Sequence, residues 1–136
     1  MIVSRSSPVP YRTDFSNGTS AAFADVPREK GGAGDGFGPH DLLEAAVATC
    51  MTITVQMYAA KHAIPLAGAT CEARLDRTVP NAIALHYSLI IDGDMTDDQR
   101  RLLREAAVKC PVARTLTGAV AIKAVESNDT ISETAT

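Results

Sequence analysis

The chain has 136 residues, 46% of them hydrophobic and 21% charged, which is typical of one globular domain with a core of its own. The formal net charge of −3 at pH 7 gives no electrostatic reason to expect binding to nucleic acid or to an anionic membrane surface. Tryptophan is absent and aromatic residues make up 4%, so the core must be built from Ala, Val, Ile and Leu.

The first ten residues contain no apolar run of the length that a signal peptide needs, so we expect a cytoplasmic protein. The segment Leu42–Ala60 is long enough to span a membrane, but it contains Glu44, Gln56 and three threonines, and no second span follows it. We therefore expect a buried core helix and no membrane partner. The three cysteines of such a chain are better interpreted as buried or reactive thiols than as a structural disulfide framework.

The N-terminal part of the chain has the pattern of short strands around a tight turn. A leading arm of ten residues carries a short strand at Ile2–Val3. Tyr11–Ser16 and Thr19–Asp25 then flank Asn17-Gly18. This dipeptide is typical of the type I′ turn, because both central residues of that turn need a positive φ. The pattern predicts an antiparallel hairpin.

A glycine-rich loop follows at Pro27–Pro39, with five glycines between positions 31 and 38. It matches neither of the common phosphate-binding patterns, and no apolar strand leads directly into it. We expect a backbone that turns sharply or lies close against another surface.

The long apolar stretch Asp41–Ala63 predicts the central helix of the fold. Asp41 places a negative charge in its first turn, and the helix is expected to end near His62–Ala63, before Pro65. Cys50 lies near its middle.

Two strands are predicted next, at Gly68–Thr78 and Ala82–Ile91, because apolar and polar residues alternate along both segments. Pro80-Asn81 turns the chain between them, which gives a second antiparallel hairpin with one buried face. Tyr87 belongs to the apolar face of the second strand.

The last third of the chain predicts two helices and a strand. The capping box formed by Thr96 and Gln99 marks the start of one helix, and three arginines are expected to form its solvated face: Arg100, Arg101 and Arg104. Pro111–Thr117 predicts a short helix with Cys110 near its N-cap, and Ala119–Val125 predicts the final strand.

This order of elements predicts an α+β fold in which a largely antiparallel sheet packs on a long central helix. Residues 1–125 are expected to form a single domain, and residues 126–136 a polar C-terminal tail.

The three cysteines differ in what their positions indicate. Cys71 lies on the apolar face of a strand, which favours inert core filling. Cys50 gains nothing from the helix dipole, so it becomes a nucleophile only if tertiary structure brings a cation to it. Cys110 is better placed, because an N-cap position stabilises a thiolate, although it also fits a core position at a helix end. Cys50 and Cys110 are consistent with an attacking and a resolving thiol.

The histidines and cysteines do not indicate a metal centre. The chain has three of each, but neither a C-x-x-C nor an H-x-x-x-H spacing occurs. We expect no metal site.

The stretch PREKGGAGDGFGPHDLLEAAVATC, which ends at Cys50, resembles the OsmC/Ohr family of osmotically induced and organic hydroperoxide resistance proteins. The family has a glycine-rich loop, a helix start with two leucines, and a cysteine after an alanine-rich run. The match continues in KHAIPLAG and in MTDDQRRLLREAAVKCPVARTLTG, which is similar to the second-cysteine segment of the family. The resemblance covers Pro27–Val125.

The resemblance implies an OsmC-like fold, an intertwined homodimer, and a pair of sites between the subunits. It also implies a thiol-dependent peroxidase that reduces organic hydroperoxides to alcohols. In this mechanism Cys50 becomes a sulfenic acid and Cys110 condenses with it to a disulfide, which an external dithiol reduces. No bound cofactor and no metal are required, and an apolar pocket would favour organic over hydrogen peroxide.

One position departs from the family pattern. Ohr-type members carry a Glu ten residues before the first cysteine, paired with an Arg that activates the thiolate, and here that position is His40. Asp41, the next residue, is the candidate for the carboxylate. The family Arg comes from the N-terminal strands, which makes Arg12 the first candidate and Arg28 the second.

Two other functions fit the same residues. The chain could form an OsmC-like dimer that binds a small apolar or electrophilic ligand without efficient peroxide turnover, as the loss of the Glu at His40 indicates. Alternatively, it could be a regulatory protein whose shape changes when Cys50 and Cys110 are oxidised.

Overall fold

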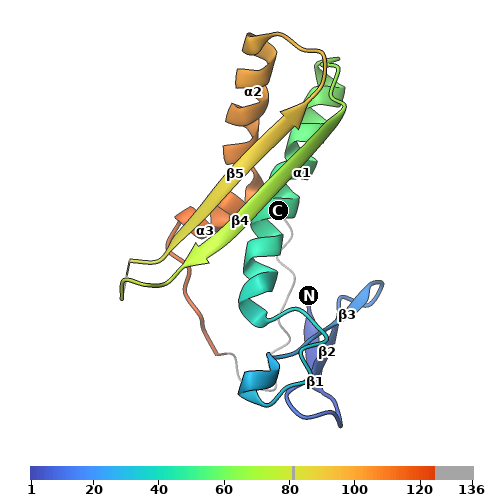
Figure 1. Ribbon diagram of the computed structural model, residues 1–136, viewed down its shortest axis with the longest axis vertical. Helices are drawn as coiled ribbons and strands as arrows, with labels where there is room; N and C mark the ends of the chain where they lie inside the picture. The colour runs from blue at the N-terminus through green and yellow to red at the C-terminus, as the bar shows by residue number, and fades with distance from the viewer. Residues whose placement is uncertain (81, 125–136) are drawn as a thin grey trace. The chain divides into compact units, whose positions relative to one another are not determined.

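The computed structural model describes residues 1–80 and 82–124 of the chain (Figure 1). The chain separates into two compact units, one formed by Met1–Pro39 with the segment that begins at Val120, the other by His40–Ala119. The single domain expected over residues 1–125 stays a prediction. The polar tail expected at residues 126–136 lies outside the described residues.

The first unit contains a three-stranded antiparallel sheet in the order β1-β2-β3. Its strands are β1 (Val3–Ser6), β2 (Thr13–Ser16) and β3 (Ala21–Ala24). The two predicted hairpin strands are present but shorter, whereas the strand predicted at Ile2–Val3 is shifted and longer, at Val3–Ser6. β2 begins at Thr13 rather than at Tyr11, because Tyr11 has a φ of 63°, in the left-handed region that an extended strand excludes.

The predicted type I′ turn is wrong. Gly18 has a φ of 97°, but Asn17 does not adopt a positive φ. Ser16 pairs with Ala21, which leaves a four-residue loop rather than a two-residue one. The side-chain oxygen of Asn17 accepts the N–H of Thr19 at 3.0 Å and that of Ser20 at 2.8 Å. The asparagine therefore shapes the turn through its side chain and not through a left-handed backbone.

The glycine-rich loop folds back on the carboxylate of Asp25, which is 2% exposed. Asp25 accepts the backbone N–H of Val26 at 2.7 Å and that of Gly34 at 2.8 Å, and it also accepts the N–H groups of Ala33 and Asp35. These hydrogen bonds, led by that from Val26, lower the pKa of Asp25, although burial opposes them. At Gly32 a Cβ would lie 2.1 Å from the carbonyl oxygen of Val26. Glycine is needed at this position because the Val26 backbone lies too close to leave room for a side chain.

The central helix, α1 (Pro39–Lys61), begins two residues before the predicted start. Its end matches the prediction, since Ala63 has a φ of 53° and the N–H of Ile64 bonds the carbonyl of Ala59 at 2.9 Å. By length and composition α1 could cross a membrane. It is instead a core helix, because one stripe of it is buried in the second unit: Val47, Met51, Val55 and Ala59.

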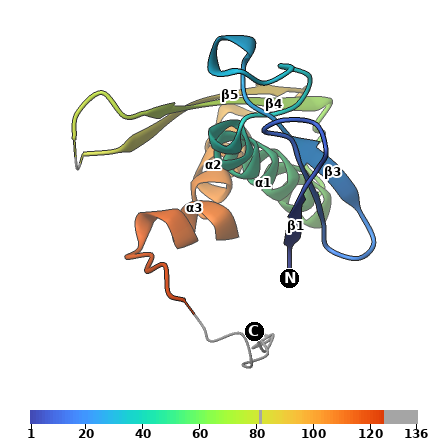
Figure 2. The ribbon, with the colours of Figure 1, turned by 90° about the horizontal axis from the view of Figure 1, so that it is seen from below.

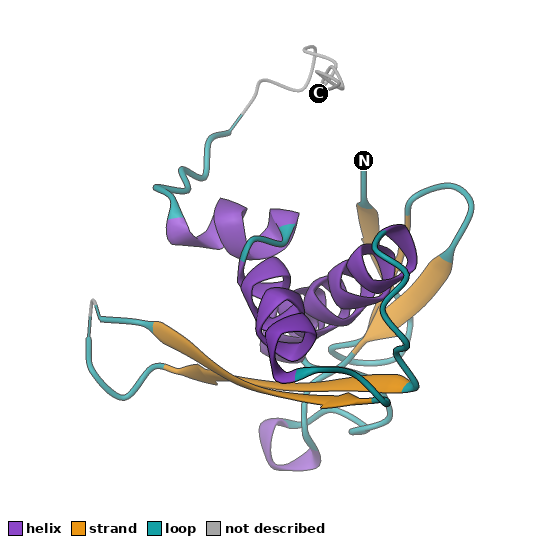
Figure 3. Ribbon diagram, turned by 90° about the horizontal axis from the view of Figure 1, so that it is seen from above, coloured by secondary structure: helices purple, strands orange, loops and turns teal. Residues whose placement is uncertain are grey.

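The rest of the second unit is a two-stranded sheet and two further helices. β4 (Gly68–Asp76) pairs antiparallel with β5 (Ala84–Asp92), and α2 (Asp97–Val108) and α3 (Pro111–Thr117) follow. One face of this sheet covers α1 and α2 (Figures 2 and 3). The predicted α+β class, with an antiparallel sheet packed on the long helix, is therefore confirmed. The buried core comprises Val47, Met51, Val55, Ala59, Ile64, Leu89, Ile91, Leu103, Ala107 and Cys110.

Helix α2 begins as predicted, but one of its three arginines, Arg100, is partly buried and not part of a solvated face. The capping box is formed, because Gln99 donates its N–H to the hydroxyl of Thr96 at 3.1 Å and accepts the Thr96 N–H at 3.0 Å. Two guanidinium groups on the helix bond the outer edge of β5. Arg104 donates to the Leu89 carbonyl at 2.8 Å, and Arg100 donates to the Ile91 carbonyl. The prediction of a solvated face is therefore wrong only for Arg100, which is partly buried; Arg104 is exposed as predicted and also donates to the edge strand, whose outer carbonyls need donors.

Arg101 does lie on the solvated face of α2, with the exposed partners Asp98 at 2.7 Å and Glu105 at 2.5 Å.

The strand predicted at Ala119–Val125 is not formed over residues 119–124. Val120 and Ile122 are 63% and 101% exposed. A strand needs a neighbouring strand for its backbone groups, and within residues 1–80 and 82–124 none pairs with this segment. Val125 lies outside the described residues.

Candidate functional site

Two thiols meet inside the second unit. Cys50 lies in the middle of α1 and is half-buried, while Cys110 lies at the start of α3 and is completely buried. The Cys50 side chain lies near enough to Cys110 to raise the pKa of the Cys110 thiol. Sixty residues of chain separate the two cysteines, and the packing of α3 beside α1 brings them into the same core. Both thiols are free.

Cys110 is the N-cap of α3, as the sequence predicted. Its backbone is extended, Pro111 occupies the first turn, and the N–H of Ala113 donates to the Cys110 Sγ at 3.4 Å. Burial raises the pKa of Cys110, the Ala113 N–H opposes this, and the neighbouring Cys50 thiol raises the pKa further. The effect of burial on the pKa of Cys110 is therefore larger than the opposite effect of the helix N-terminus. Cys110 is held as a neutral thiol.

Cys71 lies on β4 and packs against the core, at the position that the alternation of the strand predicted. Its Sγ lies 3.8 Å from the Met51 Sδ. Burial raises the pKa of Cys71, and its electrostatic interactions with Cys110 and Glu72 raise it further. Cys71 is therefore also a protonated thiol.

An apolar groove of about 490 Å³ lies between α1, β5, the end of α2 and α3; neither Cys50 nor Cys110 is among its lining residues. Met51, the neighbour of Cys50, and Ala113, which bonds the Cys110 sulfur, both line it. Its other lining residues are Val47, Ile83, Leu85, Tyr87, Val108, Leu116 and Thr117. Sequence analysis expected an apolar pocket without naming Tyr87 or Leu116. The alternation of β5 already placed Tyr87 on the apolar face, whereas Leu116 had no comparable signal.

The candidate arginines belong to the first unit and Cys50 to the second. Arg12 pairs with the Asp14 carboxylate at 3.1 Å and lies 3.8 Å above the centre of the Phe23 ring. The Arg28 Nε donates to the Ala33 carbonyl at 2.9 Å, within the glycine-rich loop. The role of either arginine beside the thiol stays a prediction.

The candidate carboxylate, Asp41, lies in the first turn of α1 and next to His40. Both residues are exposed, and nine residues of helix separate Asp41 from Cys50. Its part in the site also stays a prediction.

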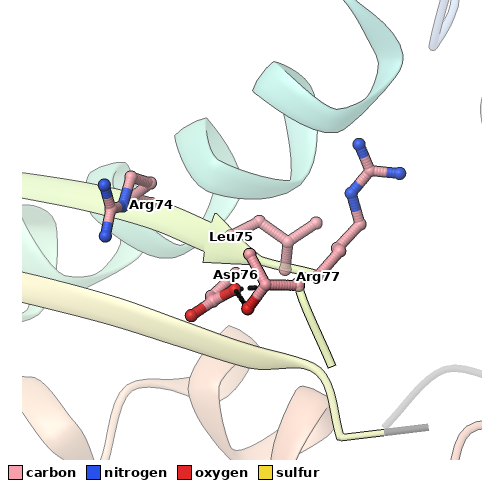
Figure 4. Close-up of a pocket in the computed structure, with 5 residues that line it drawn as sticks. Arg74, Leu75, Asp76 and Arg77 are labelled. Atoms are coloured by element: carbon pink, nitrogen blue, oxygen red, sulfur yellow. Dashed lines mark hydrogen bonds between the residues drawn. The ribbon is translucent and has the colours of Figure 1, made fainter. Parts of the chain in front are cut away.

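A second cavity, of about 560 Å³, lies at the end of the β4–β5 hairpin (Figure 4). Asp76 accepts the hydroxyl of Thr78 at 2.7 Å and its N–H at 2.9 Å, while Arg77 extends away from this pair (Figure 4). These hydrogen bonds lower the pKa of Asp76 and close the turn. The cavity holds no thiol, so we assign it to the hairpin and not to the site.

No group of three His, Cys, Asp or Glu side chains in the described part of the chain is arranged to hold a metal ion.

Comparison with known protein families identifies a family for this chain. The OsmC-like protein family matches residues 32–125. A comparison with curated proteins gave no match.

Three solved structures illustrate the similarity in fold. The chain is 20% identical to an OsmC-like protein from Mycoplasma pneumoniae, with a TM-score of 0.70 over 87% of this chain and 86% of that chain. It is 25% identical to a Psychrobacter arcticus protein described as an osmotic stress induced and detoxification response protein, with a TM-score of 0.68 over 82% and 85% of the two chains.

The third is the organic hydroperoxide resistance protein OhrB of Bacillus subtilis, at 17% identity and a TM-score of 0.58 over 87% and 90% of the two chains. These matches confirm the OsmC-like fold. Because the family match spans residues 32–125 of 136, the chain belongs to the OsmC-like protein family.

Proposed function

We propose that the chain is a cysteine-based peroxidase that reduces organic hydroperoxides to alcohols. The observation that carries this proposal is that two free thiols, Cys50 and Cys110, belong to the same core of a chain of the OsmC-like family. The structural similarity to a protein named for organic hydroperoxide resistance supports the same substrate class.

The reaction proceeds in three steps. The Cys50 thiolate attacks the terminal oxygen of the hydroperoxide, the O–O bond breaks, and the alkoxide leaves and takes up a proton to become the alcohol. Cys50 is then a sulfenic acid. Cys110 attacks the sulfenic sulfur, water leaves, and a Cys50–Cys110 disulfide forms. An external dithiol reduces this disulfide by exchange, and both thiols are regenerated.

The burial of the two thiols supports the order in which the proposed reaction uses them. Cys110 is 0% exposed, so a hydroperoxide cannot reach it from solvent, whereas Cys50 is partly accessible. Cys50 is therefore the attacking thiol and Cys110 the resolving one. The groove next to Met51 and Ala113 would hold the hydrocarbon part of the substrate.

Activation of Cys50 requires a positive charge near its sulfur. We assign this role to Arg12 by the family pattern, with Asp41 as the carboxylate that orients it. The ion pair with Asp14 and the contact with the Phe23 ring already restrict the Arg12 side chain.

We also propose that the protein works as a cytoplasmic homodimer. The support is a row of exposed apolar side chains along α1, on the side away from the core: Leu43, Ile53 and Met57. Their exposed fractions are 45%, 54% and 68%, which is costly for a helix face in water. A second copy of the chain would cover them.

A thiol count tests the peroxidase. The reduced protein is treated with one equivalent of cumene hydroperoxide, quenched immediately by a fast alkylating agent under denaturing conditions, and analysed by peptide mass. We expect Cys50 and Cys110 to be protected together while Cys71 is alkylated. The Cys50→Ser variant, which differs by one atom, should keep both remaining thiols and consume no hydroperoxide. Turnover in that variant would refute the mechanism.

A second function has its own observation, the His40 that stands where Ohr-type members carry a Glu. In this case the dimer binds a small apolar or electrophilic ligand in the groove, and the thiols do not turn over. Three alkylated cysteines after the hydroperoxide treatment, together with saturable binding of a hydrophobic fluorescent probe, would favour this function over the peroxidase.

A further inference from the structure

The apolar groove between α1, β5, α2 and α3 has one sulfur-containing side chain in its lining, the thioether of Met51. Met51 belongs to the buried stripe of α1 and is 3% exposed, whereas Met57, further along the same helix, is 68% exposed. A reagent in bulk solvent therefore reaches Met57 more easily, while a molecule held in the groove lies against Met51.

A second sulfur atom lies against the Met51 thioether. The Cys71 Sγ, on β4, donates its S–H to the Met51 Sδ at 3.8 Å. Cys71 is half-buried and packs against the same core. A thioether sulfur is a weak acceptor, so an oxygen atom added to the Met51 sulfur would accept this S–H better than the sulfur itself does.

We propose that Met51 is an oxidation site of this protein. A hydroperoxide held in the groove transfers its terminal oxygen to the Met51 Sδ, and the Cys71 thiol donates a hydrogen bond to the resulting sulfoxide. The inference rests on the proposed function in one respect, that the groove holds the hydrocarbon part of an organic hydroperoxide. It does not require the reaction of Cys50.

The step is a balanced oxygen transfer. A lone pair of the Met51 sulfur attacks the terminal oxygen of the hydroperoxide, an S–O bond forms, and the O–O bond breaks. The electron pair of the O–O bond leaves with the alkoxide oxygen, which takes up the proton of the terminal oxygen and becomes the alcohol. The sulfur is oxidised by two electrons and the hydroperoxide is reduced by two, so no further reactant is needed.

The oxidation changes both the groove and the core. Methionine sulfoxide is polar, so the apolar lining of the groove gains an oxygen atom and holds a hydrocarbon less well. In the core the new oxygen has a donor within reach, because the Cys71 thiol already contacts the sulfur. An excess of hydroperoxide therefore weakens substrate binding while the fold is kept.

Peptide mass analysis of the Cys50→Ser variant tests the proposal, because this variant cannot consume hydroperoxide through Cys50. One sample is treated with cumene hydroperoxide and a second with hydrogen peroxide, which has no hydrocarbon part for the groove to hold. The measured quantity is the amount of Met51 sulfoxide divided by the amount of Met57 sulfoxide. We expect this ratio to be at least about tenfold higher with cumene hydroperoxide, because binding raises the local concentration of the oxidant beside Met51.

Three further substitutions in the same background serve as controls, each checked for folding by circular dichroism before oxidation. Leu116→Trp fills the groove from α3 and should lower the ratio for cumene hydroperoxide towards that for hydrogen peroxide. Ile90→Trp adds the same side chain at an exposed position of β5 outside the groove and should leave the ratio unchanged. In Cys71→Ala, oxidation of Met51 should lower the thermal unfolding midpoint further than in the parent variant, since the sulfoxide oxygen then lacks its donor.

The proposal is overturned if Met51 stays unoxidised in the Cys50→Ser variant, or if the ratio is the same for both oxidants. Equal losses of unfolding midpoint with and without Cys71 would overturn the role of its thiol. Failure of the peroxidase is a different result, in which Cys50 of the wild type does not react with hydroperoxide while Met51 of the variant is oxidised as expected.

Discussion

A single hydrogen bond ties the helix that carries Cys50 to the end of the sheet. The Glu44 Oε1, in the second turn of α1, accepts the backbone N–H of Leu75 on β4 at 2.7 Å. That N–H belongs to the outer edge of β4, because Leu75 faces Leu85 on β5 and its N–H bonds Glu44 instead of the partner strand. The bond is partly buried, so water replaces it poorly when it is lost.

Glu44→Ala removes the acceptor and leaves this N–H unpaired. A hydrogen bond to a charged group contributes about 1.5–3 kcal/mol, so we expect the free energy of unfolding to fall by about 2 kcal/mol. Glu44→Gln is the matched control, because its side-chain oxygen can still accept the N–H. A neutral hydrogen bond contributes about 1 kcal/mol, so this variant should lose about half as much.

Urea unfolding followed by circular dichroism measures both effects. Protein concentration must be equal in all samples, because dimer formation would make the apparent stability depend on concentration. The slope of the transition should not change, since neither variant alters the surface exposed on unfolding. Equal losses for the two variants, or no loss in Glu44→Ala, would show that the hydrogen bond does not hold α1 to β4.

Two further predictions concern the ends of elements. Ala63→Gly should stabilise the protein by about 0.5–1 kcal/mol in the same urea assay, because a left-handed backbone at φ 53° strains alanine and suits glycine; an unchanged midpoint would contradict this. The lowered pKa of Asp25 means that its contribution to stability is present above the ordinary carboxyl pKa and is lost as the pH falls through the lowered value. Asp25→Asn should therefore be less stable than the wild type at neutral pH and lose less stability on acidification, which thermal unfolding over a pH series would measure.

The sequence predicted the elements whose signals are local. The capping box at Thr96 and Gln99 lies within one turn, and the alternation along β4 and β5 depends on neighbouring residues. The end of α1 was likewise predicted from a short segment before Pro65. Such features form wherever the local chain favours them, so a pattern of residue types is enough to find them.

The predictions that failed depended on partners elsewhere in the chain. Arg100 has the spacing of a solvent-facing residue, but it is partly buried and donates a hydrogen bond to the Ile91 carbonyl of β5, nine residues earlier. Asn17-Gly18 has the composition of a type I′ turn, but the Asn17 side chain supplies a different set of hydrogen bonds. The segment 119–124 has the residues of a strand but no strand to pair with in the described part of the chain. In each case the residue types are compatible with several structures, and contacts with other parts of the chain determine which of them forms.

The same distinction governs the candidate site. From sequence, Cys110 was the better-placed nucleophile, because a helix N-terminus lowers the pKa of a thiol. The structure gives it that N-cap position, with the Ala113 N–H at 3.4 Å from its sulfur, but also buries it completely, and burial is the larger effect on its pKa. A sequence pattern shows that Cys110 lies at a helix N-terminus, which lowers a thiol pKa. It does not show that the fold buries Cys110, which raises the pKa. A buried N-cap thiol is poorly suited to meet a hydroperoxide from solvent and well suited to resolve a sulfenic acid that forms beside it on Cys50.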